Sequence, residues 1–198
     1  MRSHFEIALF GTDDWFILRK KTDDLTELKR EYDALISCKS RYVQEVLGID
    51  LERLLINLVY YDNSRTVLNL CVKDQNLFIN ALPNIIRAIQ HCHDSGWVHG
   101  DIKPSNILIV SKNGCVRLID FSAALPIGYN RRKLLRWYVT PSFANNNQLK
   151  GEGIVSTRED WLAMLYIVNQ FLASTIYNYK QRRLAIRTRD WLISKVII

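Results

Sequence analysis

The sequence lacks long apolar runs, internal repeats and closely paired cysteines. Its longest apolar stretch, residues 54–61, has the length of a strand and is far short of the roughly 18 residues of a membrane span, so we expect no membrane association. The four cysteines are widely spaced and form no Cys-x-x-Cys pair, which favours reduced, buried thiols in a cytoplasmic protein. The first residues alternate in polarity too soon for a secretory signal.

The composition is that of an ordinary globular protein. With 198 residues, 48% hydrophobic and 24% charged, the chain is long enough to bury a full core. The net charge of +7 is concentrated in two basic clusters, one at Arg131, Arg132, Lys133 and Arg136 and one over residues 180–195. An acidic protein substrate, nucleic acid and a merely solvated helix face are all open interpretations of these clusters, and no motif supports nucleic acid.

Strand-like alternation dominates the first sixty residues. Apolar periodicity predicts a hairpin of Phe5–Phe10 with Trp15–Lys20 around a Gly-Thr-Asp-Asp turn, then strands at Val43–Val46 and Leu54–Tyr60. Between them, Asp24-Leu25-Thr26-Glu27 is typical of a capped helix start. The apolar positions of that helix place Tyr32, Leu35 and Ile36 towards the core.

Helical spacing replaces strand alternation after Asp62. An apolar stripe over 82–92 predicts a helix with Pro83 in its first turn and its end at 94–96. We expect a short hairpin of Ile107–Val110 and Val116–Ile119 around Lys112-Asn113-Gly114, a long loop to about residue 157, and a central helix over 159–171. The predicted fold class is therefore α+β, as one two-lobed domain over 1–198, with lobes at 1–61 and 62–198.

Three polar side chains border the predicted hairpin, and together they suggest chemistry. Asn106 and Asp120 supply the oxygen ligands that suit Mg²⁺ bound with phosphate. Asp101 is then free to orient a hydroxyl nucleophile, while Lys103 neutralises charge on a transferred phosphoryl group. An ordinary polar turn is the alternative reading of residues 99–106 alone.

Residues 99–106, His-Gly-Asp-Ile-Lys-Pro-Ser-Asn, resemble the catalytic loop of the protein kinase family, and Asp120-Phe121-Ser122 resembles its magnesium-binding Asp-Phe-Gly. Further along, 140–144 resembles the substrate-docking end of the activation segment, and 158–161 resembles the start of the buried helix whose aspartate, Asp160, holds the catalytic loop. The resemblance implies a kinase-like fold, ATP and Mg²⁺ as cofactors, a protein substrate, and a docking role for Thr140.

The same resemblance extends to the ATP site. Residues 15–20 resemble the strand that ends in the phosphate-binding lysine. Lys20 is preferred over Lys21 because it shares its face with Leu18, which could cover an adenine. Glu31 resembles the glutamate that pairs with this lysine, and Tyr60 and Tyr61 fall where the adenine-binding hinge is expected.

The sequence departs from the family pattern at four places. Gly100 replaces an arginine, so that activity need not wait on loop phosphorylation; Ser122 replaces a glycine, and 145–147 replace the usual Ala-Pro-Glu, which removes an anchoring ion pair. No Gly-x-Gly-x-x-Gly precedes Trp15, so we expect a reduced first lobe that binds ATP weakly or is completed by a partner protein.

An active serine/threonine kinase is the favoured interpretation because every residue expected to touch metal or phosphate is present. The alternatives are a pseudokinase or scaffold and a small-molecule phosphotransferase. The segments "HGDIK" and "STREDWLAMLY" look most like the vaccinia-related and casein kinase 1 groups, within a truncated helical lobe.

Overall fold

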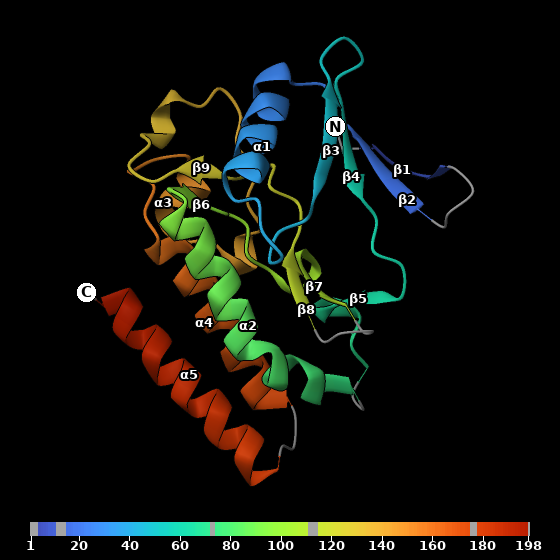
Figure 1. Cartoon of the computed structure of the whole chain (residues 1–198). Coiled ribbons are helices and arrows are strands. Elements are labelled where there is room, and N and C mark those ends of the chain that lie inside the picture. The colour runs from blue at the N-terminus through green and yellow to red at the C-terminus, as the bar shows by residue number, and fades with distance from the viewer. Residues whose placement is uncertain (1–3, 11–14, 72–73, 111–114, 175–177, 198) are drawn as a thin grey trace.

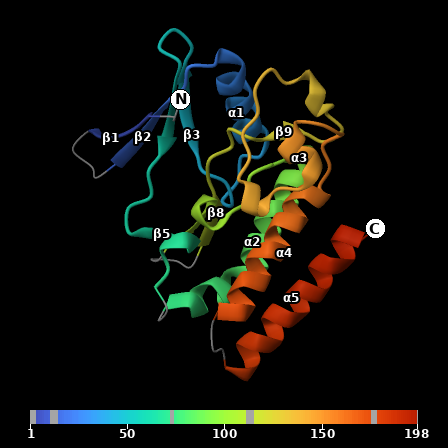
Figure 2. The same cartoon turned by 180° about the vertical axis from the view of Figure 1, so that it is seen from behind.

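The computed structural model describes residues 4–10, 15–71, 74–110, 115–174 and 178–197. The predicted turns at 11–14 and 112–114 fall outside the described residues. A sheet with one helix lies above a group of helices, which agrees with the predicted α+β fold class (Figures 1 and 2).

The N-terminal part is a four-stranded antiparallel sheet, in the order β1-β2-β4-β3, with helix α1 beside it. Helix α1 begins where predicted because the Asp24 side chain accepts hydrogen bonds from the backbone N–H groups of Thr26 and Glu27. The elements are β1 (His4–Phe10), β2 (Trp15–Lys21), α1 (Leu25–Ser37), β3 (Val46–Asp50) and β4 (Leu55–Val59).

Two local expectations in this lobe are wrong. The strand predicted over 43–46 begins only at Val46, and Val43 forms a single bridge to Leu118 before it. Ile36 is 46% exposed rather than in the core, because Leu28 and Leu35 already cover the buried side of α1. Leu35 is buried and Tyr32 packs against the core, as predicted.

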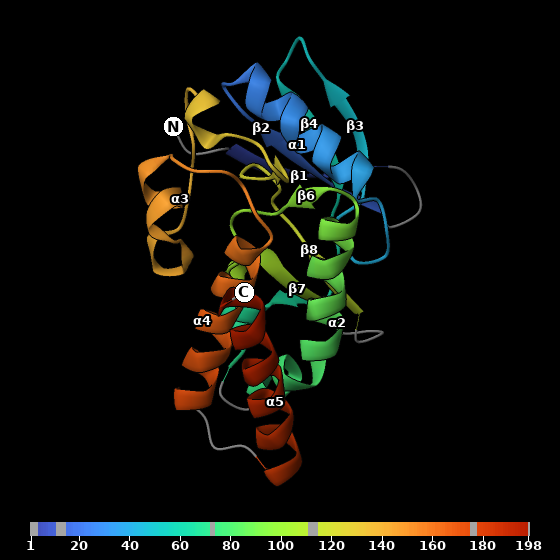
Figure 3. The ribbon, with the colours of Figure 1, turned by 90° about the vertical axis from the view of Figure 1, so that its left-hand side faces the viewer.

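The C-terminal part is built on α2 (Gln75–Asp94), α4 (Arg158–Ser174) and α5 (Tyr179–Ile197). Helix α5 lies against both α2 and α4 (Figure 3). The predicted apolar stripe of α2 is confirmed, since Leu82, Ile85 and Ile89 are fully buried. Pro83, however, lies inside α2 and not in its first turn. The helix starts at Gln75, eight residues before Pro83, and Phe78 and Ile79 bury its first turns.

Short elements between these helices position the polar residues of interest. Strands β5, β7 and β8 form a three-stranded sheet in that order, and β6 pairs with β9. Residue 106 directly precedes β7 in the chain, and residue 120 follows shortly after β8. The segment expected to be a loop up to 157 includes β9 and the small helix α3. The bounds are β5 (Ser64–Thr66), β6 (Trp97–Val98), β7 (Ile107–Val110), β8 (Cys115–Leu118), β9 (Leu125–Pro126) and α3 (Asn146–Lys150).

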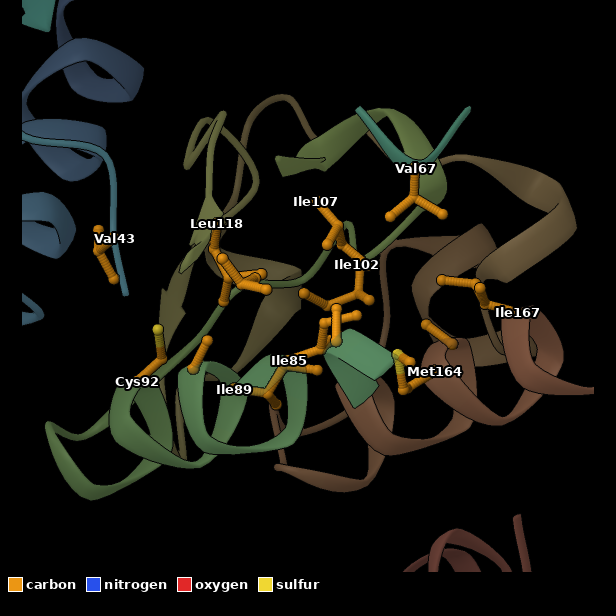
Figure 4. Close-up of a cluster of buried hydrophobic side chains, with 14 of the residues drawn as sticks. Val43, Val67, Ile85, Ile89, Cys92, Ile102, Ile107, Leu118, Met164 and Ile167 are labelled. Carbon is orange, nitrogen blue, oxygen red and sulfur yellow. The ribbon is translucent and has the colours of Figure 1, made fainter. Parts of the chain in front are cut away.

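The main core joins α2, the β7–β8 hairpin and α4 (Figure 4). Ile89 of α2, Ile107 of β7 and Met164 of α4 are each 0% exposed within it. Ile102 belongs to the same cluster, so the segment between His99 and Asn106 is anchored by its own apolar residue.

The predicted basic clusters differ in their burial. Helix α5 turns Ala185 and Leu192 inward and leaves Arg183 and Arg187 on its exposed side, so its charges are solvated. Arg131, which the sequence placed in the other basic cluster, is only 3% exposed and so does not contribute to a basic surface. No disulfide joins the cysteines of the described residues, but only Cys38 and Cys92 are buried, so the prediction of burial is wrong for Cys71 and Cys115. No helix of the described residues is long and apolar enough to cross a membrane.

Replacing Ile89 by alanine should lower the free energy of unfolding by about 2–5 kcal/mol, because the deleted atoms leave a cavity at the centre of the core. Ile36→Ala is the matched control on an exposed helical position and should change it by less than about 0.5 kcal/mol. Urea denaturation measures both. Equal losses would show that the assignment of these two isoleucines to core and surface is incorrect.

Candidate active site

Lys20 of β2 joins three elements of the chain. Its Nζ lies 2.8 Å from both carboxylate oxygens of Glu31 on α1 and 2.8 Å from Oδ1 of Asp120. Both Lys20 and Glu31 are 2% exposed. Burial alone would lower the pKa of Lys20, but the two carboxylates raise it above its usual value, so the ammonium group stays charged. The pairing of Lys20 with Glu31 is the one that the sequence predicted.

Asp120 follows β8 in a strained backbone conformation, with φ of +61°. Its Oδ1 accepts hydrogen bonds from Lys20 and, at 2.9 Å, from the Ser122 hydroxyl. Burial would raise the pKa of this carboxyl, yet the attraction of Lys20 and these hydrogen bonds lower the pKa of Asp120 to about 2. Asp120 is therefore a permanent anion at neutral pH.

Asp160 of α4 holds the segment that begins at His99. Its carboxylate accepts hydrogen bonds from the backbone N–H groups of His99 and Gly100, both at 2.9 Å, and lies 2.9 Å from Nε2 of His93. Asp160 is 1% exposed; burial would raise its pKa, but the bond to His93 and the backbone contacts lower the pKa instead. The expectation that Asp160 lies buried beneath this loop is confirmed.

Asp101, Lys103 and Thr140 meet at one point. Lys103 Nζ lies 2.6 Å from Oδ2 of Asp101 and 3.0 Å from the Thr140 hydroxyl, and the Thr140 N–H donates to Oδ1 of Asp101 at 3.2 Å. The Asp101 carboxylate therefore faces the segment that follows residue 139. A carboxylate with a lysine and a hydroxyl beside it can orient an incoming hydroxyl group and balance charge on its reaction partner.

Asn106 lies against Asp101 on the other side. Its Nδ2 donates to the Asp101 carbonyl oxygen at 3.0 Å. Because a carbonyl can only accept, the Asn106 nitrogen must face it and Oδ1 points the other way. The backbone N–H of Ile119 donates to the backbone carbonyl oxygen of Asn106 at 3.0 Å, so Asn106 lies beside the residue that precedes Asp120. The Asn106 amide oxygen and the Asp120 carboxylate are oxygen donors of the kind that a hard cation binds.

Comparison with known proteins identifies the architecture. A model of the protein kinase domain matches residues 17–194, which is nearly the whole chain and includes every residue of this site. The chain belongs to the protein kinase domain family. The resemblance to the protein kinase family that the sequence showed is thereby confirmed at the level of the family.

Relatives of this kinase domain include serine/threonine kinases at low identity. This chain is 30% identical over 93 residues to calcium/calmodulin-dependent protein kinase type II alpha chain of Drosophila melanogaster, and the match covers 45% of this chain and 18% of that protein. It is 26% identical over 150 residues to serine/threonine-protein kinase Kist of Rattus norvegicus (74% and 33%). Cyclin-dependent kinase D-1 of Arabidopsis thaliana is 28% identical over 123 residues (57% and 30%). The matches span a third or less of these relatives.

The predicted nucleotide-binding residues of the kinase domain do not all face the same way. Leu18 packs against the core on the strand that carries Lys20. The Tyr60 N–H donates to the Phe16 carbonyl, and the two rings meet edge to face at 5.9 Å. The Tyr61 hydroxyl instead accepts from the Glu45 N–H, and its ring lies under Arg117. The Tyr61 side chain is therefore held by contacts with Glu45 and Arg117, and the assignment of Tyr60 and Tyr61 to the adenine site stays a prediction.

Gly100, in place of the family arginine, has a steric reason here. Its φ is +77°, and a Cβ at this position would lie 2.6 Å from the Ala123 carbonyl oxygen. The loop can approach residues 120–124 this closely only without a side chain. An arginine of α1, Arg30, donates to the Ser122 carbonyl at 2.9 Å and ties the helix to the same segment.

The sequence did not reveal how the activation segment is anchored. Arg131 and Glu159 form a bidentate ion pair of 2.6 and 3.2 Å, and both side chains are almost fully buried. Burial raises the pKa of Glu159, opposed by the attraction of Arg131. Residues 145–148 add a capping box, and Gln148 donates to the Gly100 carbonyl. The sequence predicted the loss of an anchoring ion pair at 145–147. The Arg131–Glu159 pair and the Gln148 contact compensate for that loss, and neither forms a local sequence motif.

Gly100→Ala should destabilise the kinase domain by about 2 kcal/mol or more, because both the positive φ and the contact with Ala123 oppose a Cβ. Gly96→Ala, where φ is +85° and no neighbour lies within 4 Å, should cost only the backbone strain, about 1–2 kcal/mol. Gly48→Ala has neither obstacle and should change the free energy of unfolding little. Chemical denaturation that ranks the three substitutions differently would contradict this geometry.

Arg131→Met should cost about 3–5 kcal/mol, because it leaves the buried Glu159 carboxylate without its partner. Replacing both residues by apolar ones, Arg131→Met with Glu159→Leu, should restore much of the loss. Arg132→Met is the matched control, since its pair with Glu152 is exposed and should be worth less than about 1 kcal/mol. Thermal unfolding with similar shifts for Arg131→Met and Arg132→Met would refute the anchoring role.

Proposed function

We propose that this kinase domain is an ATP- and Mg²⁺-dependent serine/threonine protein kinase, which transfers the γ-phosphoryl group of ATP to a protein hydroxyl. The observation that carries the proposal is the meeting of Asp101, Lys103 and Thr140 within hydrogen-bonding distance. Asn106 joins this group to the residue before Asp120, since it bonds the Asp101 carbonyl and the Ile119 N–H. This arrangement provides separate groups for the acceptor hydroxyl, the transferred phosphoryl group and the metal.

The donor set fits a magnesium–nucleotide complex. Asn106 Oδ1 and the Asp120 carboxylate would hold the ion, which supplies charge neutralisation between the phosphates. Lys20 would contact the phosphates while Glu31 keeps its ammonium in place. Leu18 and the hinge backbone at Tyr60 and Tyr61 would border the adenine.

Asp101 would orient the acceptor hydroxyl and accept its proton as the hydroxyl oxygen bonds to the γ-phosphorus and the bond from that phosphorus to the β–γ bridging oxygen breaks, so that ADP leaves. Lys103 shares the Asp101 carboxylate and so places a positive charge beside the phosphoryl group at the moment of transfer. Thr140 aligns the docking segment by bonding both residues. Positioning and electrostatics thus supply most of the rate enhancement.

The substrate class is proposed from charge. Arg132, Lys133 and Arg136 are exposed on the activation segment that leads to Thr140, and they favour an acidic protein substrate. The likeness of residues 99–103 and 156–166 to the vaccinia-related and casein kinase 1 groups stays a proposal of the same rank, because the relatives described above come from other kinase groups.

A pseudokinase that acts by binding a partner is the second candidate. It is favoured by one sequence feature: no Gly-x-Gly-x-x-Gly precedes Trp15, and such a loop supplies backbone N–H groups to the phosphates. A partner protein that completes this lobe would restore those contacts. Retention of Lys20, Asp101 and Asp120 favours catalysis over this alternative.

Incubation with labelled ATP, Mg²⁺ and dephosphorylated casein should give slow, metal-dependent incorporation into serine or threonine. Asp101→Asn, Lys20→Met and Asp120→Asn should each reduce the rate by roughly 100-fold or more. Asp33→Asn, on the exposed side of α1, is the matched control and should leave the rate unchanged. Incorporation that persists in Asp101→Asn would exclude the proposed mechanism; no incorporation and no Mg²⁺–ADP thermal shift in the wild type would favour the pseudokinase.

A further inference from the structure

Gln148 of α3 uses its two amide atoms for two different tasks. Its Oε1 accepts from the Asn145 N–H at 3.0 Å, and with the return bond from its own N–H to Asn145 this closes the capping box of α3. Its Nε2 donates to the Gly100 carbonyl at 3.1 Å. Gln148 is 3% exposed, so both bonds are shielded from water.

The Gly100 carbonyl belongs to the peptide plane that immediately precedes Asp101. The other polar atom of this plane, the Asp101 N–H, donates to Nδ1 of His99 at 3.3 Å. The Gly100 N–H is taken by Asp160 at 2.9 Å. A glycine has the freest backbone of all residues, so the orientation of this plane depends on such outside contacts. Among the described residues, Gln148 provides the hydrogen bond to the Gly100 carbonyl.

We propose that Gln148 is a positioning residue for phosphoryl transfer, which orients the Asp101 carboxylate by fixing the Gly100–Asp101 peptide plane. The proposal rests on the kinase activity proposed above. Gln148 does not touch the carboxylate itself, whose oxygens are bonded by Lys103 and Thr140. Because α3 follows the substrate-docking segment, the contact couples that segment to the residue that receives the acceptor hydroxyl.

Gln148→Glu separates the two tasks of the side chain. The carboxylate still accepts from the Asn145 N–H and keeps the capping box, but at neutral pH it cannot donate to Gly100. We expect kcat to fall about tenfold, which corresponds to about 1.4 kcal/mol, with KM for ATP changed less than about twofold. Gln170→Glu, the same substitution at an exposed position of α4, should leave both constants unchanged.

The pH profile distinguishes positioning from mere helix stabilisation. A protonated carboxyl is a donor, so the ratio of the kcat of Gln148→Glu to that of the wild type should rise as the pH falls from about 8 to 6, since burial raises a carboxyl pKa. A capping role predicts the opposite trend, because an ionised carboxylate caps a helix N-terminus better. Asn145→Ala, which weakens the cap but keeps the donor, should lower the melting temperature with less than about a twofold effect on kcat.

Amide hydrogen exchange of residues 99–103 tests the contact even if the wild type proves inactive. Gln148→Glu should speed exchange there at neutral pH, whereas Gln170→Glu should not; with an inactive wild type, this result would support the orienting contact and reject only the kinase activity. Unchanged exchange overturns the proposal. An unchanged kcat in an active enzyme, or an equal loss in Asn145→Ala, overturns it as well.

Discussion

The ammonium group of Lys20 is the point on which the arrangement of the two lobes depends. It is buried, and a buried charge is tolerated only when opposite charges compensate it. Glu31 comes from α1 and Asp120 from the segment after β8, so the compensation of one lysine fixes the sheet, the helix and the hairpin relative to one another. Lys20 and Asp120, which we propose to face the nucleotide phosphates and the metal, are therefore held in place by contacts within the chain itself.

The second constraint is the attachment of the segment that begins at His99 to helix α4. Asp160 bonds two successive backbone N–H groups, and the close approach of Gly100 to Ala123 leaves no room for a side chain between them. A buried Arg131–Glu159 pair then fixes the start of the activation segment to α4. These contacts involve no phosphorylated residue; that activity need not wait on loop phosphorylation stays a prediction.

The sequence predicted what local patterns encode. The Asp24 cap and the apolar stripe of α2 followed from residue spacing, whereas the pairing of Lys20 with Glu31 followed from the resemblance to the kinase family. The errors arose where tertiary packing overrides local preference: Pro83 is tolerated inside α2 because Phe78 and Ile79 bury the turns before it. Arg131 looked like one of four surface charges, since nothing nearby in the chain announces Glu159, 28 residues away. The contact between the Tyr61 ring and Arg117 likewise joins residues that are far apart in the chain.

A structure of the protein with Mn²⁺ and a non-hydrolysable ATP analogue would test the central claim most directly. The account predicts an anomalous manganese peak between Asn106 Oδ1 and the Asp120 carboxylate, at roughly 2.0–2.3 Å from each, with Lys20 Nζ in contact with a phosphate and still bonded to Glu31. A nucleotide bound without metal at Asn106 and Asp120, or a structure in which neither binds, would contradict it.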